Sequence, residues 1–254
     1  DSGLLLQFLQ KEGVTPSALE QLGGVFALGF YRNGEVFIAR DILGEKPVWY
    51  SQENGFAFAS ERKVLLAIGY RNVVELNPRT ILRYNKKKNR LFEARRPFFE
   101  ITPQLTASRE DIRAKINKLF LHAVQKRIPE TRFGLLFSGG IDSTIIAQAL
   151  QKAGKDFTCY LSILEHESFH APGDLTVSID AAAKLGLKLK IVKASLKEVE
   201  KNLRIVAPLI EDTNVTKVAV ALTFFKACEQ AKKDGCKVIF SGLGSEEIFG
   251  GYSR

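Results

Sequence analysis

The sequence predicts an α/β protein in which a layered antiparallel β region precedes a doubly wound parallel sheet. In the first part, Asn33-Gly34 lies between two apolar runs, which is the usual signal of a tight hairpin. After residue 108, apolar strands alternate with helical patterns, as expected of a parallel sheet with helical crossovers. Two Gly-rich segments follow strands, and such sheets bind ligands at the carboxyl ends of their strands. We therefore divide the chain into residues 1–97 and 98–254.

The β region is predicted from short apolar runs that turn residues separate. The expected strands cover residues 24–30, 35–40, 55–59 and 80–84. The basic run Lys86–Arg90 is expected to be a solvated hairpin tip, in preference to a phosphate-binding segment.

In the second part, capping patterns mark the helices. Ser108 with Asp111, and Ser195 with Glu198, have the spacing of a side chain that caps a helix N-terminus. The expected strands cover residues 133–137, 157–164, 187–192 and 237–241, and the other expected helices cover residues 144–153, 175–185 and about 216–233.

Composition limits the classes of function. Of the 254 residues, 45% are hydrophobic, without a run long enough to span a bilayer. The three cysteines form no CxxC pair, so we expect reduced thiols in a cytoplasmic protein. The net charge of +9 fits a nucleotide-phosphate site as well as a nucleic-acid partner, and without an aromatic-basic module nucleic acid is the less favoured partner. The chain contains no Met, so Asp1 is expected not to be the natural N-terminus.

The strongest motif is Ser138–Ser143, with the sequence SGGIDS, between a predicted strand and a predicted helix. Glycines let backbone amides approach an anion, and the following helix presents free N–H groups. Asp142 beside a phosphate implies an intervening Mg²⁺. An ordinary glycine turn with an Asp/Ser cap is the alternative. No Gly-Lys-Ser/Thr follows, so this is not a Walker loop.

A second Gly-rich segment, Ser241–Tyr252, also follows a predicted strand. Its glycines permit a tight loop, and Glu246 and Glu247 add carboxylates at the same sheet edge. Two adjacent Glu at a helix start are also ordinary capping residues.

Together these segments resemble the glutamine-dependent asparagine synthetase family, whose synthetase domain is an ATP pyrophosphatase. Arg40–Tyr50 and Phe58–Lys63 are similar to two segments of that family's glutaminase domain, of the class II (Ntn amidotransferase) type with a four-layer α/β/β/α core. The resemblance covers the whole chain. It implies that residues 1–97 are part of a glutaminase domain without its first segment, and that residues 98–254 are a synthetase domain without its last helices.

The resemblance implies a two-step reaction in which aspartate is adenylated by ATP with release of pyrophosphate and then amidated by ammonia from glutamine. It implies that pyrophosphate and Mg²⁺ bind at Ser138, Gly139, Gly140, Asp142 and Ser143. It implies contacts with ATP at Phe137, Ser162, Ser241 and Gly242. Asp142 and Glu246 would be the catalytic residues that hold the metal, and Asp1 would bind the glutamine amino group. Members of the family are often dimers, so a homodimer is expected.

The sequence departs from the family at two functional positions. Leu243 stands where the family has a Glu that is proposed to assist ammonia attack, and the family's N-terminal Cys nucleophile has no counterpart, because Cys159 is the first cysteine. Two other functions therefore stay open. One is adenylation of a different carboxylate or of an RNA base, and the other is a non-catalytic relative that binds nucleotide or a partner.

A third pattern, His166–His170, matches the zinc-protease sequence HExxH. That chemistry requires both histidines on one face of a helix. Pro172 and Gly173 follow immediately, so we interpret the segment as a polar loop.

Overall fold

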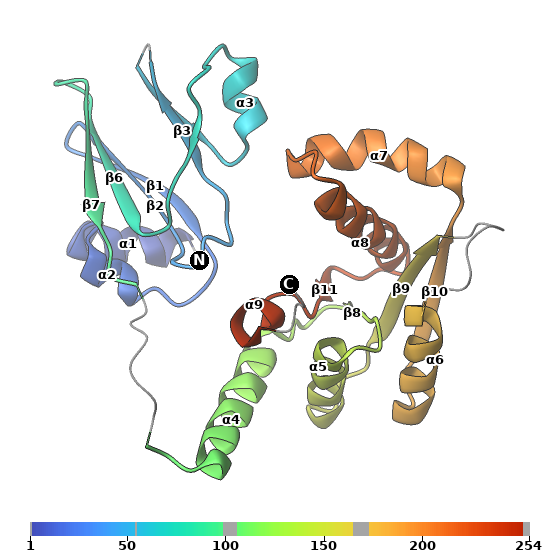
Figure 1. Cartoon of the computed structure of the whole chain (residues 1–254). Coiled ribbons are helices and arrows are strands. Elements are labelled where there is room, and N and C mark those ends of the chain that lie inside the picture. The colour runs from blue at the N-terminus through green and yellow to red at the C-terminus, as the bar shows by residue number, and fades with distance from the viewer. Residues whose placement is uncertain (1, 54, 99–105, 165–172, 251–254) are drawn as a thin grey trace. The chain divides into compact units, whose positions relative to one another are not determined.

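The computed structural model describes residues 2–53, 55–98, 106–164 and 173–250, and it divides into two compact units, Asp1–Leu105 and Thr106–Arg254 (Figure 1). The first unit contains α1 (Ser2–Glu12), α2 (Pro16–Glu20), β1 (Ala27–Arg32), β2 (Glu35–Arg40), β3 (Trp49–Gln52), β4 (Phe56–Ala59), α3 (Arg62–Ala67), β5 (Val74–Glu75), β6 (Thr80–Asn85) and β7 (Arg90–Arg95). The second contains α4 (Arg109–Arg127), β8 (Phe133–Leu136), α5 (Ile141–Lys152), β9 (Thr158–Leu164), α6 (Gly173–Leu185), β10 (Leu189–Ala194), α7 (Leu196–Ile210), α8 (Val215–Lys233), β11 (Val238–Phe240) and α9 (Ser245–Phe249).

The first unit is built from two antiparallel sheets, with strand orders β1-β2-β6-β7 and β4-β3-β5. A cluster around Ile38 and Leu82 of the first sheet and Val48 and Leu76 beside the second packs the two sheets together. On its other side, the first sheet packs against α1 and α2, and α3 contacts β3 and β4. The layered antiparallel region predicted from the sequence is therefore confirmed.

The predicted hairpins have the expected turns. Asn33 (φ 52°) and Gly34 (φ 82°) connect β1 to β2, and positive φ at both residues is what a type I′ turn requires. The basic run forms the turn between β6 and β7, where Asn89 also has a positive φ of 47°.

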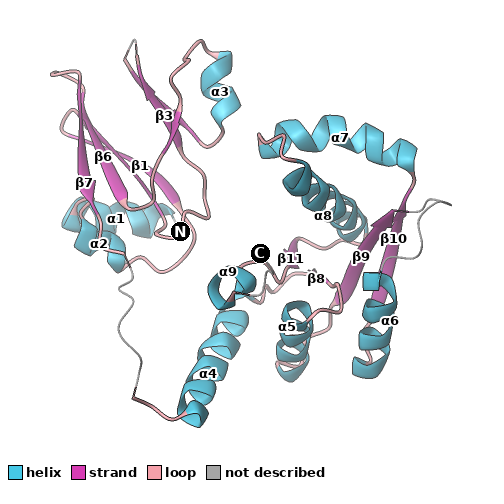
Figure 2. Ribbon diagram, viewed as in Figure 1, coloured by secondary structure: helices cyan, strands magenta, loops and turns pink. Residues whose placement is uncertain are grey.

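The second unit is a parallel sheet with the strand order β10-β9-β8-β11 and helices on both faces (Figure 2). Side chains of α4, α5 and α6 form the core on one face, where Leu135, Leu150 and Cys159 are fully buried. On the other face, α8 packs against Tyr160 and Cys236. The doubly wound parallel sheet is thus also confirmed.

The strand order of this unit reverses beside β8. The chain runs from β8 outward through β9 to β10, and α7 and α8 then return it to β11 on the other side of β8. In doubly wound sheets, ligands bind outside the carboxyl ends of the strands at such a reversal. Helix α5 begins at Ile141, three residues before its predicted start, so Asp142 lies in its first turn.

The described helices include none long and apolar enough to cross a membrane. This agrees with the absence of a long apolar run in the sequence.

Candidate functional site

Two Gly-rich loops meet at the carboxyl ends of the neighbouring strands β8 and β11. The first joins β8 to α5 and the second joins β11 to α9. Gly242 of the second loop lies so close to the start of α5 that an added Cβ would be 2.9 Å from the Asp142 Cβ and 3.2 Å from the Ser143 backbone nitrogen. The two strongest sequence motifs therefore form one site.

The first loop gathers two hydroxyl groups at a helix N-terminus. The Oγ atoms of Ser138 and Ser143 are 3.4 Å apart, and the Gly140 N–H donates to the Ser138 Oγ over 3.4 Å. Gly140 is the N-cap of α5 and supplies no side chain to bond the free N–H groups of the first turn. A helix N-terminus of this kind, with hydroxyl groups beside it, is suited to an anion such as a phosphate group.

Gly139 is needed for a reason that differs from the one inferred from the sequence. Its φ is +75°, and an added Cβ would lie 2.8 Å from the backbone of Ser178 in α6. The missing side chain thus makes room for α6. Gly140 has an ordinary φ of −67°, and its nearest neighbour to an added Cβ is the Ser138 hydroxyl at 3.4 Å.

Phe137, a predicted ATP contact, has a side chain that is 1% exposed and packs in the core between the sheet, α4 and α5. Its backbone N–H donates to the Tyr160 carbonyl over 2.9 Å. Only the Phe137 backbone at the strand end could therefore face a nucleotide.

The second loop places polar and apolar groups side by side. Ser241 and Glu246 are half-buried, and the Ser245 hydroxyl donates to the Gly242 carbonyl over 3.0 Å. Gly244 has a φ of +101° just before α9. Leu243, at the tip, is 60% exposed, so an apolar side chain lies in the position where the resemblance implied a carboxylate.

The site offers two carboxylates, Asp142 and Glu246, to a metal ion. The described residues form no group of three or more His, Cys, Asp or Glu side chains that could hold a metal ion by themselves. This donor set fits Mg²⁺, which is usually held by one or two carboxylates together with waters and substrate phosphates.

Ser162, another predicted ATP contact, lies in different surroundings. It is on the same face of β9 as Tyr160, which packs against α8, and it lines a small cavity below α7 and α8. The cavity also includes Asn202 and Lys226, which the sequence analysis did not select. Asn202 is a polar residue on the buried side of the amphipathic helix α7. A polar residue in such a position is the one signal in the sequence that could have indicated it.

In the first unit, the family-like segment 40–50 forms a tightly bonded loop. The Asp41 carboxylate accepts hydrogen bonds from the backbone N–H groups of Glu45 (2.9 Å) and Lys46 (3.0 Å). Burial acts to raise the pKa of Asp41, but these hydrogen bonds outweigh it and lower the pKa. Arg40, 5% exposed, donates to Glu75 (2.8 Å) and to the Gly44 carbonyl (2.7 Å). The adjacent residues Arg40 and Asp41 therefore hold the loop, each through its own hydrogen bonds.

Two sequence predictions lie outside the described residues. Asp1, the predicted glutamine contact, is one, and the HExxH segment His166–His170 is the other.

The second unit is a doubly wound α/β domain in which two Gly-rich loops meet at the carboxyl ends of neighbouring strands. An antiparallel layered unit precedes it in the chain. Residues 115–254 match the asparagine synthase family model, and residues 1–117 match the glutamine amidotransferase domain model. The chain belongs to the glutamine-dependent asparagine synthetase family.

Two relatives agree with this assignment in sequence. The chain is 33% identical over 255 residues to a putative glutamine-hydrolysing asparagine synthetase of Methanocaldococcus jannaschii, with 93% of this chain and 46% of the relative covered. It is 26% identical to asparagine synthetase B of Escherichia coli, with 99% and 47% covered. The chain thus spans about half the length of these relatives. An NH3-dependent NAD synthetase from Campylobacter jejuni overlaps 55% of this chain and 61% of its own, at 20% identity and a TM-score of 0.39.

Proposed function

We propose that this chain carries the nucleotide-activating site of a glutamine-dependent amide ligase that acts on a carboxylate, with aspartate as the first candidate. The observation that supports this best is the packing of Gly242 against Asp142, where an added Cβ would be 2.9 Å from the Asp142 Cβ. It brings the start of α5 and the loop that leads into the carboxylate-bearing α9 next to each other.

The proposed reaction has two steps. A carboxylate oxygen of the substrate attacks the α-phosphorus of ATP, the bond to the bridging oxygen breaks, and pyrophosphate leaves. Ammonia from glutamine then attacks the acyl carbon, AMP leaves with the bonding electrons, and the nitrogen loses a proton. The substrates of this reaction are ATP, the carboxylate, and glutamine or ammonia.

The first loop is suited to hold the departing pyrophosphate. The Ser138 hydroxyl and the free N–H groups at the start of α5 would donate to the β- and γ-phosphate oxygens. The Ser143 hydroxyl, which donates to the Gly140 carbonyl over 3.2 Å, would join them by turning its proton toward the phosphate. We infer that Gly140 allows close approach, and that the backbones of Phe137, Ser241 and Gly242 contact the rest of the nucleotide. Catalysis by such groups is chiefly positioning.

Asp142 and Glu246 are the residues that we propose hold Mg²⁺. The ion, when bound, would offset the negative charge that develops on pyrophosphate. Asp142 and Glu246 would hold the ion beside the N-terminus of α5, where we propose that the pyrophosphate binds.

The assembly and location of the protein are proposed more generally. The three cysteines are free thiols, in keeping with a reducing compartment such as the cytoplasm. A homodimer is the expected assembly.

A second candidate function rests on Leu243, whose side chain is 60% exposed beside the site. An apolar group there disfavours a charged substrate group nearby. In this alternative, the chain adenylates a carboxylate other than aspartate.

The test is carboxylate-dependent exchange of radiolabelled pyrophosphate into ATP, with aspartate and a panel of other carboxylates. Exchange that requires aspartate supports the first candidate, and exchange with another carboxylate alone supports the second. ATP binding without exchange on any carboxylate would overturn both.

Variants of the two carboxylates test the site itself. Asp142→Asn and Glu246→Gln should each slow exchange by about 10²-fold or more, since each removes charge stabilisation at the leaving group. Asp180→Asn, on the exposed surface of α6, is the matched control that should leave exchange unchanged. Equal exchange in all three variants would contradict the metal role.

A further inference from the structure

A small cavity lies between the carboxyl ends of β9 and β10 and the helices α7 and α8. Its volume is about 50 Å³. A single water needs at least about 10–15 Å³ of space, so the cavity admits a group of about three to five non-hydrogen atoms. Its lining residues are Ser162, Ile163, Leu164, Ala194, Val199, Asn202, Leu222, Thr223 and Lys226.

Asn202 is the unusual member of this lining. Its side chain is 7% exposed, and no hydrogen bond to its carboxamide is made within the part of the chain that the structure describes. The nitrogen and oxygen of this amide are not among the fully buried side-chain atoms that lack a partner, so they are accessible from the cavity. There a water molecule or a ligand group can form hydrogen bonds with them.

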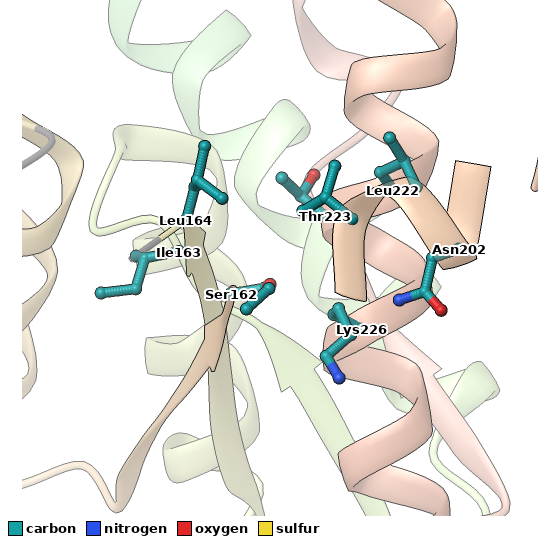
Figure 3. Close-up of a pocket in the computed structure, with 9 residues that line it drawn as sticks. Ser162, Ile163, Leu164, Asn202, Leu222, Thr223 and Lys226 are labelled. Atoms are coloured by element: carbon teal, nitrogen blue, oxygen red, sulfur yellow. The ribbon is translucent and has the colours of Figure 1, made fainter. Parts of the chain in front are cut away.

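A second polar group, the hydroxyl of Ser162, also lines the cavity. The Ser162 hydroxyl, on β9, also has no hydrogen-bond partner among the described residues, and Figure 3 shows the polar ends of Ser162 and Asn202 turned toward each other across the cavity. Thr223 already donates its hydroxyl to the Val220 carbonyl (2.7 Å), so toward the cavity it can only accept. The remaining lining is mostly aliphatic.

The cavity is lined by one charged residue, Lys226, whose ammonium group is already paired. The Lys226 ammonium group is 2.9 Å from the Glu198 Oε1 and 3.5 Å from the Glu229 Oε2, and the hydrogen bond to Glu198 raises the pKa of Lys226. Two carboxylates thus share one cation, so an anionic ligand would find no unpaired positive charge. Neither carboxylate is among the lining residues, so a cationic ligand would find no carboxylate partner within the cavity.

The wall that carries Asn202 is firmly held. Glu198 is part of a capping box at the start of α7, where its Oε2 accepts from the Ser195 N–H (2.9 Å) and hydroxyl (3.0 Å). Its other oxygen accepts from Lys226 of α8. Helix α7 is thereby fastened to α8 one turn before Asn202, which makes the cavity a preformed feature.

We propose that this cavity binds a neutral primary carboxamide, the group that ends the side chains of asparagine and glutamine. A carboxamide with its methylene has four non-hydrogen atoms, which fits the volume. Its carbonyl would accept from the Asn202 NH2 and the Ser162 hydroxyl, and its NH2 would donate to the Asn202 carbonyl or to Thr223. The choice of these two amino acids rests on the proposed function, in which one is product and the other nitrogen donor.

Binding of asparagine, glutamine and aspartate to the full 254-residue chain tests the proposal, with ¹⁵N NMR of the Asn202 side-chain NH2 as the local signal. We expect saturable shifts with one or both amides and none with aspartate, and which amide binds more tightly identifies the source. Asn202→Leu should weaken amide binding about tenfold or more, and Asn117→Leu, on the exposed face of α4, should not.

The stability of the variants separates a ligand site from a structural amide. If Asn202 has no protein partner, Asn202→Leu keeps the melting temperature of the wild type or raises it. Asn202→Asp, which has the same shape but lacks the NH2 donor, should also lose amide binding. Unchanged affinity in both variants, equal binding of aspartate, or no shift with either amide at millimolar concentrations would overturn the proposal. Pyrophosphate exchange, measured in the same samples, reports separately on the proposed function.

Discussion

Gly139 is the residue of the first Gly-rich loop that lies against the backbone of α6. Its positive φ and the 2.8 Å approach to the α6 backbone each exclude a side chain. The sequence identified this residue as part of an anion-binding loop, but its reason for being glycine depends on α6, which lies almost forty residues further along the chain. Local sequence cannot reveal a contact of that kind, because it is created only when the sheet and its helices pack.

Gly139→Ala should therefore destabilise the fold. A non-glycine residue in the left-handed region costs about 1–2 kcal/mol, and overpacking adds about 1–3 kcal/mol, so we expect a loss of about 2–5 kcal/mol in the free energy of unfolding. Gly186→Ala is the matched control, since Gly186 has a φ of +63° but nothing within 4 Å of an added Cβ, and it should lose only the first part. Urea unfolding measures both. Equal losses would show that α6 moves aside freely.

In the proposed reaction, we expect Leu243 to affect amide formation and not adenylation. We propose that adenylation depends on the first Gly-rich loop and the two carboxylates, whereas the exposed Leu243 side chain cannot take a proton from the attacking ammonia. Because general-base help is worth about 10²–10⁴-fold in rate, Leu243→Glu should raise ammonia-dependent amide formation and leave pyrophosphate exchange nearly unchanged.

Leu243→Gln is the control, since it adds a polar side chain that cannot take the proton. If the unmodified protein already forms the amide at a rate that Leu243→Glu does not improve, the position has no base role. An equal gain in the Gln variant would assign the effect to polarity.

At the level of elements, the features predicted best from the sequence are turns and helix caps, which depend on residues adjacent in the chain. The Asn33-Gly34 hairpin and the Ser195-Glu198 capping box were both predicted and confirmed, because each is decided by a few adjacent residues. The strands β3 and β5 were not predicted. Strand β5 has only two residues, Val74–Glu75, and its pairing with β3 comes from the fold rather than from a pattern.

The candidate site shows the same division. Both Gly-rich loops were found from the sequence, since each lies directly between a strand and a helix. The contact between Gly242 and Asp142 follows from β8 and β11 being neighbours in the sheet, which the order of the strands along the chain does not reveal. The cavity around Asn202 was missed because its walls come from four elements.

The capping box of α7 should make stability depend on pH. The hydrogen bond from the Ser195 backbone, followed by the one from Lys226, lowers the pKa of Glu198 from its ordinary value of 4.5 to about 2. A group with a depressed pKa in the folded state stabilises the fold above its unfolded pKa and loses this contribution as pH falls to the folded pKa. The contribution of Glu198 should thus be complete above about pH 5 and disappear between about pH 4.5 and pH 2.

Glu198→Gln measures this contribution. The melting temperature of the variant should lie below that of the wild type at neutral pH, and the difference should shrink as pH falls from 4.5 to 2. Glu200→Gln, on an exposed carboxylate of the same helix, should change the melting temperature less. A difference between wild type and Glu198→Gln that stays constant down to pH 2 would mean that the charge of Glu198 does not matter.

At the scale of the whole chain, the two units differ in their content of cysteine thiols. All three cysteines lie in the second unit. Cys159 is fully buried in the sheet, and burial raises its pKa to about 12. Burial also raises the pKa of Cys228. Since the thiolate is the reactive form, the glutaminase-like unit of these 254 residues holds no thiol that could attack glutamine.

A purified protein of these 254 residues should therefore release no glutamate from glutamine, and any amide formation should require added ammonium. Glutamate and pyrophosphate are measured in the same samples, so that carboxylate-dependent pyrophosphate exchange shows that the second unit is folded. Ammonium chloride in place of glutamine is the positive control for the second step. If glutamate appears, the triple variant Cys159→Ser, Cys228→Ser, Cys236→Ser identifies its origin. Release that the variant abolishes would assign it to a thiol of the second unit, and release that persists would require a nucleophile other than cysteine. Either result would contradict the prediction, because both provide glutamine hydrolysis without a thiol in the first unit.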